Sequence, residues 1–91
     1  MNKRVELKIF GLVQGINYRW SSQKEAKRRN LFGFVRNLSD ETVQIVIEGQ
    51  EEDLKNFIHW CYNGVATARV DKIEASWSQA TGEFTDFLIQ F

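Results

Sequence analysis

Residues 11–19 read Gly-Leu-Val-Gln-Gly-Ile-Asn-Tyr-Arg, and they join an alternating apolar segment to a polar segment rich in lysine. This order predicts a strand, a loop with two glycines, and a helix that opens on Arg19. Glycine lets backbone N–H groups turn toward one point at little steric cost, and the first turn of a helix adds unpaired N–H donors. Arginine adds a fixed charge with forked donors. The stretch therefore predicts a site for an anion such as a phosphate or carboxylate.

The same residues argue against a nucleotide site. The stretch lacks the Lys-Ser/Thr pair that closes a P-loop, and the spacing of Gly11 and Gly15 differs from the G-x-G-x-x-G of dinucleotide-binding proteins. Glycine also occurs in many strand–helix turns that bind nothing. From these residues alone, an anion site and a plain turn both remain open.

Residues 2–10, which precede the stretch, predict a strand covered on one face, because apolar and polar side chains alternate. Residues 18–29, which follow it, predict a helix with a thin apolar stripe at four-residue spacing. Asn30 is suited to end that helix in a left-handed conformation, a role that glycine more often has. The apolar side of the strand consists of Val5, Leu7 and Ile9, and the stripe of the helix consists of Tyr18, Ser22 and Ala26.

Two short apolar runs at residues 31–37 and 43–48, separated by turn residues, predict an antiparallel hairpin. The acidic residues 51–53 suit the first turn of a second helix, where the dipole favours negative charge. Gly64 is placed to end this helix. Its apolar stripe follows the i, i+3, i+4, i+7 spacing and consists of Leu54, Phe57, Ile58 and Cys61.

Residues 68–77 and 84–91 predict the last strands, which could pair as a hairpin, with a bulge near residues 71–72 where the alternation slips. The order is β-α-β-β-α-β. It predicts an α+β, ferredoxin-like sandwich, in which two helices cover one face of an antiparallel four- to five-stranded sheet.

The composition fits one domain over residues 1–91. Twelve basic and twelve acidic residues give a net charge of zero, which argues against a nucleic-acid or membrane partner. A single cysteine, Cys61, excludes an internal disulfide, and no apolar run is long enough for a signal sequence or a membrane span. We therefore expect a soluble, cytoplasmic monomer. One cysteine and one histidine leave no cluster with metal-ligand spacing, so no metal is expected.

Two motifs together resemble the acylphosphatase family: the stretch at 11–19 and Gly-Phe-Val-Arg-Asn at 33–37. The similarity extends over nearly the whole chain, including Glu-Gly at 48–49 and an F-x-I-x-F ending. Ile16, Tyr18 and Glu41 stand where the family commonly has valine, phenylalanine and glycine. Because glycine in the turn at position 41 would permit positive φ, Glu41 predicts a different turn conformation.

Members of this family hydrolyse the carboxyl–phosphate bond of small acyl phosphates to a carboxylate and inorganic phosphate, without metal or cofactor. The resemblance implies that Arg19 binds the phosphoryl oxygens and that Asn37 orients the attacking water. An acyl phosphate already carries a good leaving group, so positioning and charge stabilisation suffice. A pocket that grips only the phosphoryl end predicts broad acceptance of acyl groups. The backbone amides implied to hold the same group are those of Gly15, Ile16, Asn17, Tyr18 and Arg19.

Two other classes of protein fit part of the sequence. Residues 31–36 echo the aromatic RNP1 motif of RNA-recognition domains, but Asn30, Leu31 and Asn37 stand where that motif needs a basic residue, a glycine and an aromatic residue. A regulatory domain of the same fold without catalysis is the second alternative, and Arg19 and Asn37 together argue against it. The only histidine, His59, lies off the apolar stripe and is expected to be exposed.

The sequence alone does not assign a role to the three tryptophans. Each fits either packing in the core or a patch on the surface. They are Trp20, Trp60 and Trp77.

Overall fold

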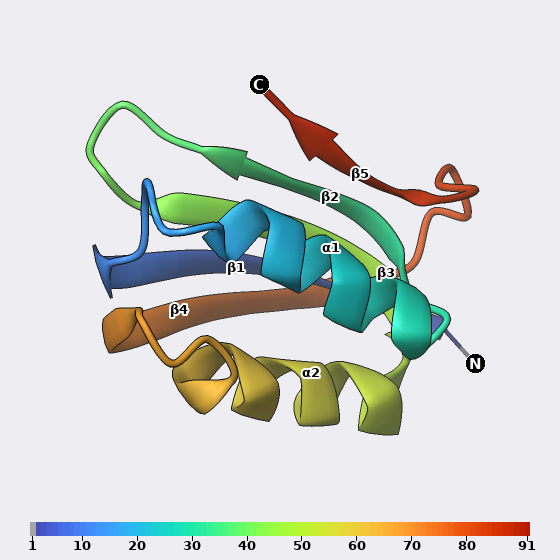
Figure 1. Cartoon of the computed structure of the whole chain (residues 1–91). Coiled ribbons are helices and arrows are strands. Elements are labelled where there is room, and N and C mark those ends of the chain that lie inside the picture. The colour runs from blue at the N-terminus through green and yellow to red at the C-terminus, as the bar shows by residue number, and fades with distance from the viewer. Residues whose placement is uncertain (1) are drawn as a thin grey trace.

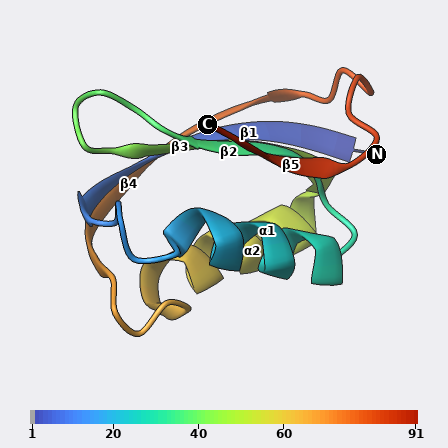
Figure 2. The same ribbon diagram turned by 45° about the horizontal axis from the view of Figure 1, so that its top comes forward.

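The computed structural model describes residues 2–91 and shows five strands and two helices (Figure 1). Both helices lie on the same face of a single sheet (Figure 2). This confirms the predicted β-α-β-β-α-β order and two-layer arrangement, with a short fifth strand at the end of the chain. The elements are β1 (Asn2–Leu12), α1 (Tyr18–Arg28), β2 (Phe32–Asn37), β3 (Val43–Gln50), α2 (Glu51–Asn63), β4 (Arg69–Gln79) and β5 (Phe87–Gln90).

The sheet is mixed, so the prediction of a purely antiparallel sheet is wrong. Its strand order is β4-β1-β3-β2-β5, and β5 pairs with β2 in parallel. The predicted hairpin between the last two strands is also wrong, because β4 and β5 lie at opposite edges (Figure 1). β3 pairs with one side of β2, so β5 can pair only with the other side, which lies at the edge of the sheet opposite β4. The chain crosses the sheet through residues 80–86 to reach it, and this shortens the expected strand at 84–91 to four residues.

The core lies between the sheet and the two helices, as the sequence patterns predicted. The apolar side of β1 is fully buried, and the thin stripe of α1 is the buried side of that helix. The two helices are joined by the buried Tyr18, whose hydroxyl donates to the backbone oxygen of Cys61 at 2.7 Å. The buried side chains of these three elements are Val5, Leu7 and Ile9 in β1, Tyr18, Ser22 and Ala26 in α1, and Leu54, Phe57 and Cys61 in α2.

The predicted bulge lies where β1 leaves the sheet for the loop at 13–17. Phe10 pairs with Lys72 and Gly11 pairs with Val70, so Asp71 is the extra residue. Gly11 has a φ of 136°, and a Cβ there would lie 1.9 Å from a backbone oxygen of β4. Only glycine fits this close approach, which sets the direction in which the chain enters the loop.

Positive φ occurs at two positions outside the sheet on which the sequence made a prediction, Asn30 and Glu41. Asn30 has a φ of 58° and ends α1 as predicted. Glu41 has a φ of 72°, so the expectation that its turn differs from one with glycine there is wrong. Backbone contacts from Leu38 to Thr42 and from Glu41 to Leu38 hold the turn, and they impose the conformation on Glu41 in spite of its Cβ.

Among residues 2–91, no helix has the length and hydropathy needed to cross a lipid bilayer.

The face of the sheet opposite the helices carries a buried carboxylate. Glu48 in β3 is 4% exposed and accepts hydrogen bonds from the backbone N–H groups of Thr81 and Gly82, at 2.9 and 3.0 Å. It also accepts from the Arg4 guanidinium at 3.1 Å, which contacts Glu83 as well. Burial alone would raise the pKa of Glu48, but these hydrogen bonds outweigh it and the pKa lies below its ordinary value. Glu48 thus fastens the connection between β4 and β5 to the sheet.

We expect Glu48→Gln to lower the free energy of unfolding by about 2 kcal/mol at neutral pH, because a charged acceptor is lost from a buried network. Glu83→Gln is the matched control. It removes the exposed partner of the same Arg4 and should cost less than about 1 kcal/mol. Denaturant titration measures both losses, and equal losses would contradict the role of Glu48.

The pH dependence of folding stability gives a second test of Glu48. Because the folded-state pKa of Glu48 is lowered, its contribution is complete above the ordinary carboxyl pKa of about 4 and disappears as the pH falls through the folded-state pKa. The difference in stability between wild type and Glu48→Gln should therefore shrink below about pH 4. A difference that stays constant in acid would count against this assignment.

Candidate active site

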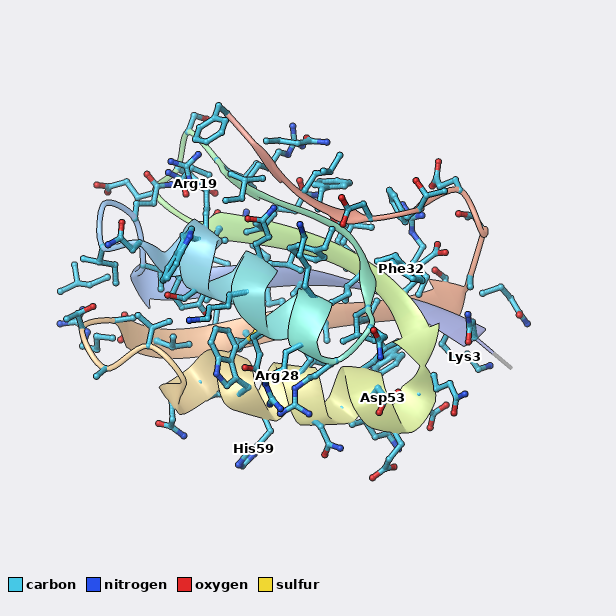
Figure 3. The ribbon with its side chains drawn as sticks, turned by 45° about the vertical axis from the view of Figure 1, so that its right-hand side comes forward. Lys3, Arg19, Arg28, Phe32, Asp53 and His59 are labelled. Carbon is cyan, nitrogen blue, oxygen red and sulfur yellow. The ribbon has the colours of Figure 1, made fainter. Side chains whose placement is uncertain are left out.

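A hollow of about 340 Å³ lies where the loop at 13–17, the start of α1 and the ends of β2 and β5 meet. Figure 3 shows Arg19 at this end of the molecule, whereas Lys3 lies at the other end and His59 points away on the outer side of α2. His59 is exposed, as expected. The hollow is lined by Val13, Gly15, Asn17, Tyr18, Arg19, Trp20, Asn37, Ile89 and Phe91.

The structure therefore brings together all but one of the residues predicted for the site. The exception is Ile16, whose side chain packs against the core and supplies only backbone to the loop. The residues that do line the hollow are Gly15, Asn17, Tyr18, Arg19 and Asn37.

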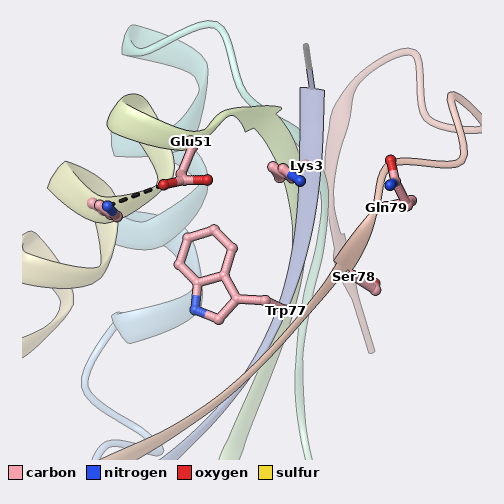
Figure 4. A pocket seen from close by; sticks show the side chains of 6 residues that line it. Lys3, Glu51, Trp77, Ser78 and Gln79 are labelled. Carbon is pink, nitrogen blue, oxygen red and sulfur yellow. Dashed lines mark ion pairs between the residues drawn. The ribbon is translucent and has the colours of Figure 1, made fainter.

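A second hollow, of about 450 Å³, lies between β4 and the start of α2 (Figure 4). Glu51 and Lys55 at its edge form an ion pair at 3.0 Å. Its walls contain none of the residues predicted for the site; they are Lys3, Glu51, Lys55, Trp77, Ser78 and Gln79.

The loop backbone is suited to an anion. Gly15 and Asn17 both have positive φ, 75° and 63°, which turns the chain tightly just before the helix. The Asn17 carbonyl accepts the first helical hydrogen bond, from Ser21 at 2.9 Å. The N–H groups of the first turn have no acceptor inside the helix, and they carry the positive end of its dipole.

Two side chains fix this loop in place. Burial raises the pKa of Tyr18, and its neutral hydroxyl clamps the start of α1 to α2 through the Cys61 backbone. Gln14 donates from Nε2 to the backbone oxygens of Leu38 and Thr42, both at 2.9 Å, and so ties the loop to the hairpin turn that follows β2. Gln14 was not predicted from the sequence. Its signal was a single polar side chain between Gly11 and Gly15.

Arg19 is held at the rim of the hollow by the end of β5. Its Nη1 atom lies 3.4 Å from the backbone oxygen of Gln90, and its guanidinium carbon lies 4.8 Å from the centre of the Phe91 ring. Neither Gln90 nor Phe91 was predicted from the sequence to contact Arg19. No motif marks a backbone oxygen, and Phe91 was noted only as the aromatic end of a strand.

Asn37 is the last residue of β2, paired with Val43 across the hairpin. Its Oδ1 atom is buried without a hydrogen-bond partner, and residues 2–91 contain no other buried side-chain polar atom in that condition. An unpaired buried acceptor costs about 1–3 kcal/mol. Such a cost is typical of a position where a ligand or a water supplies the missing donor.

Arg19 supplies the formal charge of the hollow. Within the described part of the chain, its lining side chains include no carboxylate, thiol, imidazole or amine. Cys61 lies behind the loop in the core, and burial raises the pKa of its thiol, so it remains uncharged. The hollow can therefore hold an anion and orient a small polar molecule, but it offers no side chain suited to a covalent intermediate.

The chain is similar to known proteins over nearly its whole length. The Acylphosphatase family model matches residues 5–89. The acylphosphatase of Thermococcus kodakarensis is 43% identical over 79 residues, 87% of each chain, and that of Geotalea uraniireducens is 40% identical over the full length of both. The crystal structure of the Bacillus subtilis acylphosphatase superposes with a TM-score of 0.94 at 31% identity, covering 98% of this chain and 99% of the other.

A glycine loop with an arginine at the helix start and an asparagine at the end of β2 thus occurs in a chain that matches the acylphosphatase family model over residues 5–89. The chain belongs to the acylphosphatase family, the hydrolases that act on acyl phosphates.

Proposed function

We propose that the hollow at the start of α1 is the catalytic site, with Arg19 and the loop amides of residues 15–19 binding the phosphoryl group. Asn37 orients the water that attacks it. The observation that carries this proposal is the buried, unpaired Oδ1 of Asn37 beside the only cationic group that lines the hollow among the described residues. An acceptor without a donor, next to an anion site, is suited to hold a water molecule against phosphorus.

The proposed reaction needs no nucleophile from the protein. The guanidinium of Arg19 and the N–H groups of the first helical turn stabilise the negative charge on the equatorial phosphoryl oxygens. No group of the protein forms a covalent bond with the water. The water donates one hydrogen bond to Asn37, and this bond orients the water oxygen toward phosphorus. The new bond joins the water oxygen to phosphorus, and the bond from phosphorus to the acyl oxygen breaks.

The electron pair of the broken bond leaves with the carboxylate. An amide is a poor base at neutral pH, so the water proton passes to an oxygen of the substrate's own phosphate. The products are a carboxylate and inorganic phosphate. The contacts of Arg19 with Gln90 and Phe91 hold the guanidinium beside the site before the substrate arrives, which limits the entropy lost on binding.

We also propose an oligomeric state, a compartment and a class of partner for the enzyme. Residues 1–91 form one domain that acts as a cytoplasmic monomer on a small-molecule substrate, with no nucleic-acid partner. The balanced charge and the single cysteine of the sequence support this. Analytical ultracentrifugation is expected to give one species of 10.7 kDa.

The test of the function is hydrolysis of acetyl phosphate and benzoyl phosphate by the purified protein in excess chelator. We expect both substrates to be hydrolysed at rates that addition of chelator does not change, because Arg19 and the loop amides supply the charge stabilisation. Phosphate release measures acetyl phosphate, and loss of absorbance measures benzoyl phosphate. A folded protein that hydrolyses neither substrate would refute the proposed site.

A further inference from the structure

The hollow is lined by more residues than a phosphoryl group alone would contact. Its polar part consists of the loop, Arg19 and Asn37, which suit an anion and a water. At about 340 Å³ it lies within the size range of pockets for small organic ligands, roughly 300–1,000 Å³. The rest of its wall is apolar or aromatic and is formed by Val13, Tyr18, Trp20, Ile89 and Phe91.

Trp20 is the least explained part of this wall. The buried side of α1 faces the core, whereas Trp20 lies two residues beyond Tyr18, is 56% exposed, and among residues 2–91 stands outside the core cluster. Trp60, in contrast, packs against the core and stacks on Phe57 with ring centres 5.7 Å apart. A large exposed aromatic side chain in a concave site is typical of a surface that contacts a ligand.

Cations hold both exposed rings of the hollow. The Lys24 ammonium lies 5.2 Å from the centre of the Trp20 ring, and the Arg19 guanidinium lies 4.8 Å from the centre of the Phe91 ring. Such contacts limit the motion of each ring without covering all of it. Phe91 is fully exposed, so its surface is also available to a ligand.

The position of Arg19 links these rings to the substrate. In an acyl phosphate, one oxygen atom separates the acyl carbon from phosphorus. A phosphoryl group bound by Arg19 and the loop therefore brings its acyl group against the remaining wall of the same hollow. A small acyl group leaves the rings exposed, whereas a flat aromatic group can stack on them and bury apolar surface.

We propose that Trp20 and Phe91 form an acyl subsite that favours aromatic acyl phosphates over small aliphatic ones. This inference rests on the proposed function of Arg19 and the loop, and it narrows the broad acceptance that the sequence predicted. Trp20 sets specificity by contact with the acyl group and takes no part in the chemistry at phosphorus.

The test compares benzoyl phosphate with acetyl phosphate in wild type, Trp20→Ala, Trp20→Phe and Trp77→Ala. Trp20→Ala is expected to raise KM for benzoyl phosphate about tenfold with little change in kcat, because uniform binding of the acyl group is lost. KM for acetyl phosphate should change less than about threefold. Trp20→Phe should restore most of the benzoyl phosphate affinity. Trp77→Ala, which removes another exposed indole, 42% exposed at the second hollow, should alter neither substrate.

Three results would overturn the acyl subsite, and they are distinguishable. Equal losses on both substrates would mean that Trp20 acts through the phosphoryl site or the fold. No loss on either substrate would mean that Trp20 contacts no acyl group. If the folded wild type hydrolysed neither acetyl nor benzoyl phosphate, the proposed function itself would fail, and the subsite with it.

Discussion

Arg19→Ala is expected to lower kcat/KM for acyl phosphates by about a thousandfold and to weaken the binding of inorganic phosphate. Arg19 is the only cationic side chain of the described residues that lines the hollow, so its loss leaves backbone amides alone to stabilise three phosphoryl oxygens. Losses of about 10²–10⁵ are typical when a group that stabilises developing charge is removed. Steady-state kinetics measure the first effect, and competitive inhibition by phosphate measures the second.

Two further variants separate charge from geometry at this position. Arg19→Lys keeps the charge but loses the planar fork, so we expect an intermediate loss. Arg28→Ala removes an exposed arginine from the same helix, where it pairs with Glu25 at 2.6 Å, and should leave turnover unchanged. Tight phosphate binding by Arg19→Ala would remove Arg19 from the phosphoryl site.

Asn37→Ala should reduce kcat by about 10²–10³ while leaving phosphate affinity within about twofold of wild type, because the proposed role of Asn37 is to contact the water and not the anion. Its folding stability should stay the same or rise, since the variant removes a buried acceptor that has no partner inside the protein. Kinetics, phosphate inhibition and denaturant titration provide the three measurements.

Asn37→Asp supplies the contrast. A carboxylate can also accept a hydrogen bond from water, but its negative charge lies beside the phosphate and should weaken phosphate binding as well as turnover. If Asn37→Ala lost phosphate affinity and turnover together while remaining folded, the division of work between Arg19 and Asn37 would be incorrect.

The elements with a clear period were predictable from sequence. The alternation of β1 and the i, i+3, i+4, i+7 stripe of α2 each report burial on one side of a single element. The slip in β4 likewise gave the bulge at Asp71. Each of these patterns is local, so the sequence carries it directly.

The position of β5 was not predictable in the same way. Its partner β2 is distant in the chain, and nothing in the local pattern of residues 84–91 specifies a parallel strand at the far edge. In the sequence, Glu48 is only one residue of a Glu-Gly pair. Its contacts with Thr81 and Gly82, which fasten residues 80–86 to the sheet, are visible only in the structure. Arrangement of the sheet is a property of long-range pairing and not of the pattern within one strand.

The glycine loop by itself marked Arg19 as part of a possible anion site, whereas only the resemblance to a family pointed to Asn37; periodicity marks neither residue. The unpaired Oδ1 of Asn37 depends on burial by neighbours, and Gln90 contacts Arg19 through its backbone. Neither property has a signature in side-chain type. Gln14 was visible as a polar residue in an apolar loop, but its two acceptors belong to a turn far along the chain.

The strand order also has a kinetic consequence. Only β2 and β3 form a hairpin, whereas β1 pairs with β3 and β4, and Gly33 in β2 pairs with Phe87 in β5. Strands that are distant in the chain lose the entropy of closing a long loop before their contacts stabilise the sheet. Folding is therefore slow. Because Ile89 and Phe91 complete the wall of the hollow, a chain that refolds from denaturant should recover catalysis only after β5 has paired with β2, whichever strand docks last.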